Sequence, residues 1–537
     1  MRWNLLIGLF LLPLLCACSG GESRVVSGNR EGILHMGNGT EPQELDPHAV
    51  TGVPEHNILL ALFEGLVGKD PVTLAPVPGV AERWEISEDG RTYTFHLRHD
   101  AKWSNGDALT AEDFRWSWWR GLQPTLGNEY AYMLYPIKNA ENYVTGKLDD
   151  FSQVGVKVLD DYTLEVQLNE PTTYFLQLLD HQSYFPVPRK ILEQFGGVSA
   201  RFSKWTRPGN MVSNGPFRLK EWKLYDRVAV EKNPHYWDAA NVKLNGIVFY
   251  PTENTSTEER MFRSGQLHMT SSIPLDKIPA YRANHPDALR MNPYLGSYYF
   301  EVNITRPGLD DVRVRRALAM TVDRDTLINT VLQGVNFPAY AITPPGTSGY
   351  QPPQLFKFDP EGARKLLAEA GYPDGKGFPK IEILYNTNEG HRKIAVALQQ
   401  MWKQYLNIDV GMVNQEWKVY LDNRDTHNYD IARAGWIGDY VDPNTFVGMW
   451  ITGGGNNHTG WSNAQFDDLV LRRIPAMQTE EETLAGFHEA ETILMESMPI
   501  IPVYTYSTKY LLDPAVKGLS ANIMDFYSFK NVWLEPR

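Results

Sequence analysis

Short runs in which apolar and polar residues alternate recur along this 537-residue chain, with glycine and proline spread between them. In one such run, the apolar side chains of Tyr93, Phe95 and Leu97 fall on one face, and two threonines and a histidine fall on the other. An alternation with a period of two predicts a half-buried β-strand. The pair Asn105-Gly106, which follows soon after, predicts a turn.

Helix starts are marked by capping residues at two places. Thr110 is followed three residues later by Asp113, which resembles a capping box with aspartate in place of the usual glutamate. Farther along, Asp359 and Pro360 open a run with helical periodicity that ends at Gly371, as expected for a capped helix. Helix-like and strand-like runs alternate along the chain, so we predict a mixed α/β fold.

The composition is that of a globular protein, with 42% hydrophobic and 21% charged residues, and the length suffices for two or three cores. The formal net charge is −13 and no basic patch stands out, which argues against a nucleic-acid-binding protein. No P-loop, metal-binding or nucleophile motif is recognisable, so we predict no catalytic residue, no cofactor and no metal.

The N-terminus predicts an export signal. Residues 5–15 are apolar but too few to span a bilayer comfortably. The sequence Leu-Cys-Ala-Cys at residues 15–18 fits a lipoprotein signal, in which Cys18 is acylated and becomes the mature N-terminus; a plain secretory signal cut near Ser19 is the alternative. The two cysteines of this signal are the only ones in the chain, so the body has no disulfide. Residues 19–31 are polar, which predicts a flexible tether.

One segment, residues 432–446, concentrates candidate binding residues. It places Arg433, Trp436 and Asp439 among small and aliphatic neighbours. We expect a strand edge that runs into a turn and ends at Pro443. Asp439 suits a ligand ammonium and Trp436 suits a pocket wall. An ordinary buried ion pair of Arg433 with a nearby acid, or with Asp439 itself, remains open at this point.

Eight segments, in order along nearly the whole mature chain, carry a family resemblance. They are EPQELDPHAVTGVPEHNILLALFEGL, PGVAERWEISEDGRTYTFHLR, AKWSNGDALTAEDF, NGPFRLKEW, KNPHYWD, RSGQLHM, DDVRVRRALAMTVDRDTL and ARKLLAEAGYPDG. Through them the chain resembles the periplasmic oligopeptide-binding proteins of peptide ABC importers, which form bacterial solute-binding protein family 5.

The resemblance implies an α/β, three-lobe periplasmic-binding-protein fold of type II (Venus-flytrap), with mixed sheets and a two-segment hinge between lobes I and III. The implied limits are a signal peptide at 1–18, a tether at 19–31, lobe I at 32–64, 189–290 and 507–537, lobe II at 65–188 and lobe III at 291–506.

The function implied is that of a receptor, not an enzyme. It captures short oligopeptides in a cleft between lobes, through backbone pairing and contacts with the terminal charges, and delivers them to the permease and ATPase subunits of an ABC importer. We expect a periplasmic monomer that touches the membrane only through its lipid anchor.

Specific residues follow from the same resemblance. Backbone pairing is implied along Gly435 to Ile437 and along Thr51 to Val53, and main-chain pairing would tolerate varied ligand side chains. Asp439 would take the ligand α-ammonium. Tyr130 would contribute to binding at the ammonium end. Trp436 would form the wall of a pocket for a ligand side chain or belong to the core.

The other end of the ligand is implied to meet basic residues. Arg433, Arg424 and His391 match positions that contact the C-terminal carboxylate at different ligand lengths, and arginine can give such a group two hydrogen bonds. A solvated Arg424 and a structural His391 are the alternatives. Tyr504 and Tyr506 either reach the cleft or pack in the core.

One departure from the family bears on specificity. Thr51 stands where an acidic residue is common, which makes a preference for lysine-rich peptides doubtful. The main alternative function is a relative specialised for one ligand, such as murein tripeptide, a nickel chelate or an oligosaccharide. An exported, tryptophan-rich glycan hydrolase is a more distant one, since no pair of flanking acids can be named.

Overall fold

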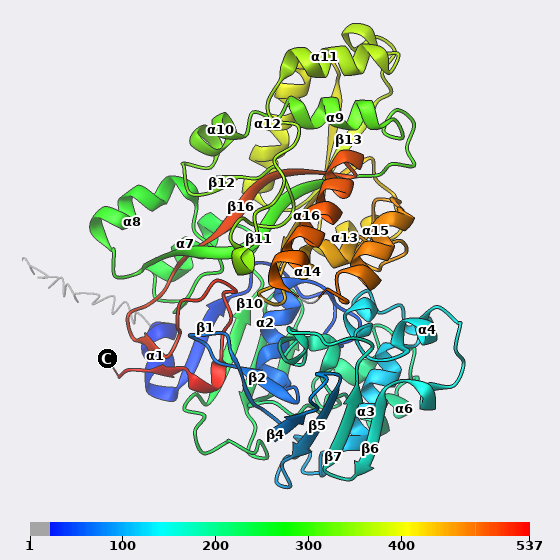
Figure 1. Ribbon diagram of the computed structural model, residues 1–537. Coiled ribbons are helices and arrows are strands. Elements are labelled where there is room, and N and C mark those ends of the chain that lie inside the picture. Colours follow the sequence, from blue (N-terminus) through cyan, green and yellow to red (C-terminus); the bar gives the residue numbers. More distant parts are fainter. Residues whose placement is uncertain (1–21, 478, 537) are drawn as a thin grey trace, which may run out of the picture.

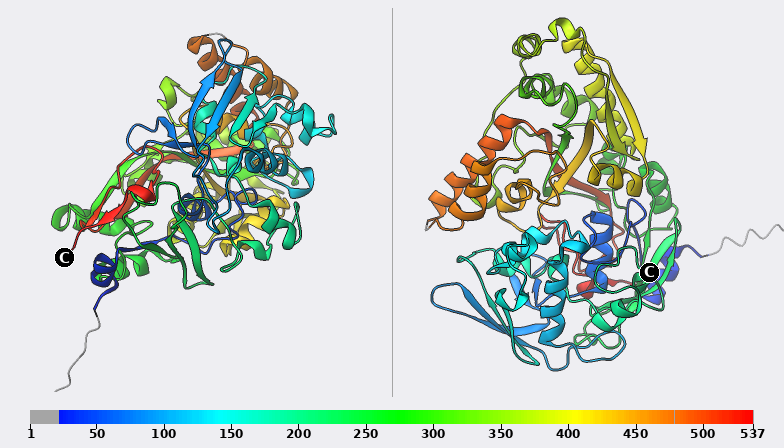
Figure 2. Two further views of the ribbon diagram at one scale, coloured as in Figure 1. Left: turned by 90° about the horizontal axis from the view of Figure 1, so that it is seen from below. Right: turned by 90° about the vertical axis from the view of Figure 1, so that its right-hand side faces the viewer.

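The computed structural model describes residues 22–477 and 479–536. The predicted signal peptide and the lipidation site at Cys18 therefore lie outside the described residues. Two large bodies face each other, with the blue-to-cyan part of the chain at the bottom of the view and the yellow-to-orange part at the top (Figure 1). The same division is visible from the side (Figure 2).

A four-stranded sheet in the lower body joins two distant parts of the chain. Its order is β1-β10-β9-β8, with β1 parallel to β10. The strands are β1 (Ile33–Gly37), β8 (Phe217–Lys223), β9 (Arg227–Lys232) and β10 (Gly246–Tyr250). Leu34, Ile247 and Phe249 are fully buried in its core. Both parts of the chain fall within the predicted lobe I.

A second sheet, antiparallel throughout, has the order β4-β5-β7-β6. The strands are β4 (Ala81–Ile86), β5 (Thr92–Leu97), β6 (Val156–Asp160) and β7 (Thr163–Gln167). In β5, Tyr93, Phe95 and Leu97 are buried and the residues between them are not, so the predicted half-buried strand is confirmed. All four strands fall within the predicted lobe II.

Helix α3 (Ala111–Gly121) covers this sheet. The predicted capping box at its start is confirmed, because the Thr110 amide donates to a carboxylate oxygen of Asp113 over 2.8 Å. Trp118 is fully buried and its indole N–H donates to the carbonyl of Tyr184 over 2.9 Å. The tryptophan-rich stretch therefore builds the core.

The third sheet, in the upper body, is mixed. Its order is β12-β16-β11-β15-β13-β14. The strands are β11 (Leu289–Val302), β12 (Phe337–Pro338), β13 (Ile381–Asn386), β14 (Val410–Gln415), β15 (Ile431–Ile437) and β16 (Ile500–Leu511). Strand β13 is parallel to both β14 and β15, whereas β15 is antiparallel to β11.

The two longest strands connect the bodies. Strands β11 and β16 pair along most of their length, with a shift of register between Pro293 and Ser297. Below the third sheet, Leu512 forms a bridge with Met269, which in turn bridges to Met36 in β1. These two strands thus link the third sheet to the first, as a two-segment hinge requires (Figure 1).

Helices cover the third sheet and complete the upper core. They include α9 (Val312–Met320), α11 (Pro360–Glu369), α12 (Glu389–Leu406) and α16 (Glu480–Ser497). The predicted helix after Asp359 is confirmed: the Asp359 side chain accepts from the Gly362 amide over 3.0 Å, and Gly371 has a φ of 99° just past the end. The buried Trp402 of α12 donates to the carbonyl of Leu318 in α9 over 3.0 Å, which fixes the two helices together.

The tether prediction is wrong for its second half. Residues Arg24–Glu31 form helix α1, which is capped by Ser23 and ends at Gly32 with a φ of 68°. Val25 is 2% exposed, and its amide donates to the carbonyl of Gly265 over 2.9 Å. Caps and one buried valine are enough to dock this polar stretch against β1. Within the described residues, no helix combines the length and apolar character needed to cross a membrane.

Candidate ligand-binding cleft

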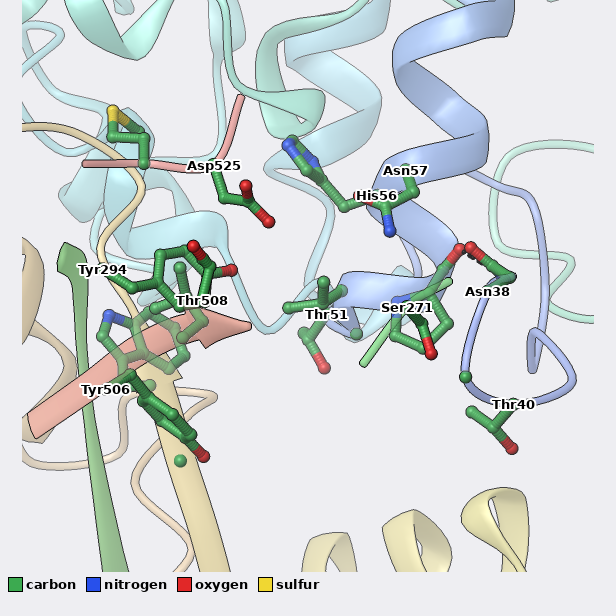
Figure 3. Close-up of a pocket in the computed structure, with 18 of the residues that line it drawn as sticks. Asn38, Thr40, Thr51, His56, Asn57, Ser271, Tyr294, Tyr506, Thr508 and Asp525 are labelled. Atoms are coloured by element: carbon green, nitrogen blue, oxygen red, sulfur yellow. Dashed lines mark hydrogen bonds between the residues drawn. The ribbon is translucent and has the colours of Figure 1, made fainter. Parts of the chain in front are cut away.

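A cavity of about 450 Å³ lies between the two bodies and is lined by residues of both (Figure 3). Its walls include the free side of β15, the lower half of β16 and the start of α2 (Val53–Leu62). Ten of the twelve predicted ligand-binding residues line it: Thr51, Val53, Tyr130, Arg424, Arg433, Gly435, Trp436, Ile437, Asp439 and Tyr506.

One edge of β15 is open to this cavity. The strand pairs with β11 along its whole length, but with β13 only at Ile431 and Ala432. From Arg433 to Ile437 its second edge has no strand partner in the part of the chain that the structure describes. Gly435 is exposed there, and a Cβ at this position would lie 2.4 Å from the Tyr506 hydroxyl. An unpaired edge of this kind can accept an extended peptide as an additional strand.

The strand runs into a turn before Pro443, as predicted. Its last residue is Ile437, and the amide of Gly438 donates to the carbonyl of Leu295 over 2.7 Å. Pro443 then precedes the short helix α14 (Asn444–Val447). The amide of Asp439 donates to the hydroxyl of Thr445 over 2.9 Å, so the turn holds Asp439 just beyond the open edge.

Asp439 carries a carboxylate oxygen that has no hydrogen-bond partner among residues 22–477 and 479–536. Its side chain is 13% exposed, and its Oδ1 lies 3.4 Å from Nε2 of His181. Its Oδ2 is buried without a hydrogen bond. The predicted alternative of an Asp439–Arg433 pair is absent among the described residues. A buried, unsatisfied carboxylate oxygen is unfavourable, so a ligand ammonium would relieve this cost.

Arg433 also lacks a counterion in the described part of the chain. It donates to the Tyr506 hydroxyl over 2.8 Å and to Oδ1 of Asn386 over 3.4 Å, and its guanidinium lies 4.8 Å from the ring centre of Tyr298. Its Nε is buried without a partner. The ordinary ion pair considered for Arg433 is therefore wrong. Neutral groups position its charge at the cavity and leave that charge free for an anion.

Trp436 is both core and cavity wall. It is 7% exposed and its indole N–H has no partner. Its ring centre lies 5.9 Å from that of Tyr130, which comes from the other body. Tyr130 also meets His181 edge to face at 4.5 Å. These aromatic residues enclose the space next to Asp439.

Arg424 lines the cavity but is already paired. It donates to Glu301 through Nε over 2.9 Å and through Nη2 over 2.7 Å. The Glu301 side chain is fully buried, and that of Arg424 is 14% exposed. A solvated Arg424 is therefore excluded. This bidentate ion pair also occupies the two nitrogens that would best bind a ligand carboxylate.

Three predicted positions depart from the ligand-contact role, and for His391 and Tyr504 the structure matches the structural alternative. Val53 is the first residue of α2, so only Thr51 and Gly52 remain extended on that side of the cavity. His391 does not line the cavity; its Nδ1 lies 3.3 Å from the Tyr298 hydroxyl, and burial holds its pKa well below the usual range. It is thus neutral and structural here. Tyr504 stacks on Tyr298 at 4.7 Å, which supports its packing role.

Several cavity residues were not predicted from the sequence: His56, Lys69, Asp180, His181, Lys509 and Asp525. Lys69 and Asp180 form a buried ion pair of 3.2 Å, with side chains 7% and 10% exposed. Burial lowers the pKa of His56 to about 4, so this ring is neutral near pH 7. These residues come from strands, helix α2 and loops that are far apart in the sequence and share no recognisable spacing, so no sequence pattern could have grouped them.

One cluster outside the cavity has the residue types of a cation site. The side-chain atoms of Glu129, Asp425 and His458 that could coordinate a metal ion all lie within 4.8 Å of one another, where the two bodies meet. Burial, and then the nearby Asp425, raise the pKa of Glu129 to about 8. Arg201 lies 3.9 Å from Glu129 and supplies positive charge there already, so the cluster is explained as an interlobe contact.

Comparisons with known proteins agree with this architecture. Residues 75–458 match the family of bacterial extracellular solute-binding proteins, family 5. The periplasmic oligopeptide-binding protein OppA of Escherichia coli is 40% identical over 494 residues, which cover 90% of this chain and 89% of that protein. The crystal structure of Haemophilus influenzae OppA in complex with RPPGFSPFR has a TM-score of 0.89 at 36% identity and covers 94% of this chain and 99% of the other.

A third relative reports on the arrangement of the lobes. The structure of the E. coli murein tripeptide-binding protein MppA matches with a TM-score of 0.88 over 94% of this chain and 98% of that one. The unliganded open form of MppA matches with a TM-score of only 0.61. The identity is again 36%, and the match covers 94% of this chain and 97% of that one. The lobes described here are therefore not in the open arrangement. By sequence and by structure, the chain belongs to family 5 of the bacterial extracellular solute-binding proteins, which are extracytoplasmic binding receptors and not enzymes.

Proposed function

We propose that this protein is the substrate receptor of an ABC importer and that it binds short oligopeptides as an added strand along β15. One observation carries the proposal. A carboxylate and a guanidinium, Asp439 and Arg433, lie at the two ends of the same open strand edge. In the described protein, Asp439 faces Nε2 of His181 at 3.4 Å but has no lysine or arginine partner, and Arg433 has no acidic partner. A peptide offers the complementary set: an ammonium, a backbone and a carboxylate.

The spacing suggests a ligand length. Strand residues rise by about 3.3 Å each, so the edge from Arg433 to Ile437 is roughly 13 Å long. An extended ligand of about three to five residues spans that distance with its ammonium toward Asp439. Main-chain pairing at Gly435 contributes affinity without reading side chains, which would permit a broad range of peptides.

Lobe closure follows from the placement of the contacts. Tyr130 and His181 come from the lower body, whereas Trp436 and Asp439 belong to the upper body. A ligand held between them gains contacts on both sides only when the lobes are closed, so binding shifts the open–closed equilibrium. The closed receptor would then dock on the permease, and ATP hydrolysis would be the task of other subunits.

The anchoring of the receptor is a further part of the proposal. The sequence around Cys18 fits a lipoprotein signal, and helix α1 begins at Arg24. Five residues separate Cys18 from that helix, a reach of at most about 20 Å when fully extended. A lipid at Cys18 would hold the receptor close to the membrane surface.

Native mass spectrometry tests the function. The mature protein, purified without refolding, would be compared with the Asp439→Ala variant. We expect co-purifying masses that match a mixture of short peptides, and we expect the variant to lose them. A single recurring mass would favour a receptor specialised for one ligand, with murein tripeptide as the first mass to check. No bound mass in the wild-type protein would contradict peptide capture.

A further inference from the structure

The cleft contains a second carboxylate without a basic partner, Asp525. It lines the same cavity as Asp439 and projects into it beside Tyr294 and Thr508 (Figure 3). Its hydrogen bond within the described protein comes from the Tyr527 hydroxyl, over 2.6 Å. Burial raises the pKa of Asp525 to about 6, so the group is still mainly ionised at pH 7.

No cation of the described protein neutralises Asp525. Two lysines line the same cavity, and neither forms an ion pair with Asp525. Lys509 donates to the carbonyl of Ser507 over 3.2 Å. Lys69 lies over the ring of Phe526 at 5.2 Å. Lys69 is already paired with Asp180 at 3.2 Å. His56, which also lines this part of the cavity, is neutral because burial lowers its pKa to about 4. An ionised carboxylate in a buried site needs a partner, and none of these residues supplies one.

The surroundings of Asp525 suit a long cationic side chain. Three tyrosines line the cavity near it: Tyr294, Tyr510 and Tyr527. The pKa of each hydroxyl is raised, first by burial and second by the negative charge of Asp525. Aromatic rings around a carboxylate hold the apolar part of a lysine or arginine side chain and attract its charged end. Neutral rings with one acidic group therefore form a pocket for a cation.

Asp525 and Asp439 line one cavity together with Tyr294. The charges of both carboxylates add to the effect of burial in raising the pKa of the Tyr294 hydroxyl, which agrees with their placement in one neighbourhood. A ligand whose α-ammonium is held by Asp439 directs the side chain of its first residue into this neighbourhood. The side chain of that residue begins only one bond beyond the carbon that carries the ammonium.

The loop that carries Asp525 is fixed before any ligand arrives. The side-chain oxygen of Asn522 accepts from the amides of Met524 and Phe526 over 3.1 and 2.9 Å. The side-chain nitrogen of Asn522 donates to the carbonyl of Pro71 over 3.1 Å. Asp525 itself has a φ of 50°, a left-handed conformation that aspartate tolerates better than most residues. Its carboxylate is thus preorganised at the cavity.

We propose that the cleft selects peptides whose first residue has a cationic side chain, and that Asp525 is the residue that binds this cation. The inference rests on the proposed function. The uncharged Thr51 made a preference for lysine-rich peptides doubtful. Under this proposal, a basic peptide is recognised through its first residue by Asp525, and Thr51 is not needed for it.

Calorimetry with two matched peptides tests the proposal. Lys-Ala-Ala and norleucyl-Ala-Ala have first side chains of similar length that differ in the terminal ammonium. At pH 7.5 we expect the wild-type protein to bind the lysine peptide about 10- to 100-fold more tightly, as for a hydrogen bond between charged groups. In Asp525→Asn this ratio should fall to about one. The control is Asp409→Asn, whose side chain is 85% exposed and which should retain the wild-type ratio.

The outcomes separate the two proposals. Equal affinities of the wild-type protein for the two peptides would overturn the role of Asp525, and this result does not depend on whether the variant folds. A lysine preference that survives in Asp525→Asn would overturn it as well. If neither peptide binds to the wild-type protein, the proposed peptide-binding function itself fails, and the specificity inference fails with it.

Discussion

Two arginines of the cleft, nine residues apart, have opposite roles. Arg424 is clamped by two hydrogen bonds to the buried Glu301. Arg433 touches only neutral partners, chiefly the Tyr506 hydroxyl and the ring of Tyr298. The family resemblance suggested both for a ligand carboxylate. The structure distinguishes a charge that the protein has neutralised from a charge that remains for a ligand.

The same contrast holds for the acids of the cavity. Asp180 has Lys69 as its counterion, whereas Asp439 and Asp525 have no lysine or arginine partner in the described protein. Pairs within the protein stabilise the fold, and unpaired groups favour ligands of opposite charge. Changes at the paired groups should therefore affect mainly stability, and changes at the unpaired groups should affect mainly ligand binding.

Replacing Arg424 should mainly damage stability. Arg424→Met leaves the buried Glu301 without its partner, which typically costs about 3–5 kcal/mol. A denaturant titration should show a large drop in the unfolding midpoint. The double variant Arg424→Met/Glu301→Met should recover most of the loss, because it leaves no buried charge behind. A single variant as stable as the wild type would contradict the structural role.

Replacing Arg433 should mainly damage ligand binding. Arg433→Met keeps the side-chain volume and leaves no carboxylate unpaired, so we expect the unfolding midpoint to change little. The affinity for a tripeptide with a free carboxylate should fall about 10- to 100-fold, as expected for the loss of a charged hydrogen bond. The same peptide with an amidated C-terminus should lose much less. Calorimetry with both peptides provides the measurement, and an unchanged affinity for the free acid would count against the proposal.

Acidification should weaken the lysine preference. Burial raises the pKa of Asp525 to about 6, and only its ionised form attracts a lysine. The ratio of the affinities for Lys-Ala-Ala and norleucyl-Ala-Ala should therefore have its maximum value above pH 7 and should decline as the pH falls through 6. The neighbouring Tyr294, Tyr510 and Tyr527 have pKa values raised above their usual range, so they do not titrate here. A ratio that stays constant from pH 7.5 to 5 would contradict this assignment.

The sequence was informative where signals are local. Alternation around Phe95 and caps at Thr110 and Asp359 predicted elements that the structure confirms. Helix α1 was missed, since a short polar stretch gives little periodic signal and is held by its caps and by the buried Val25. The lobe limits remain predictions.

The site was only partly predictable for a related reason. Motif matching named Asp439 and Arg433, but it could not show that Glu301, 123 residues away, already holds Arg424. Asp525 lies in a loop with no recognisable pattern. Whether a charge is available depends on long-range partners, and one sequence alone does not reveal them.

The most direct test of the account is whether Asp439 recognises the ligand ammonium. Calorimetry would compare Ala-norleucyl-Ala with its analogue in which lactate replaces the first alanine, so that a hydroxyl replaces the ammonium without added bulk. In the wild-type protein we expect the analogue to bind at least about thirtyfold more weakly. In Asp439→Asn the two ligands should bind almost equally. If the analogue loses the same factor in both proteins, Asp439 does not contact the ammonium and the account of the cleft is wrong.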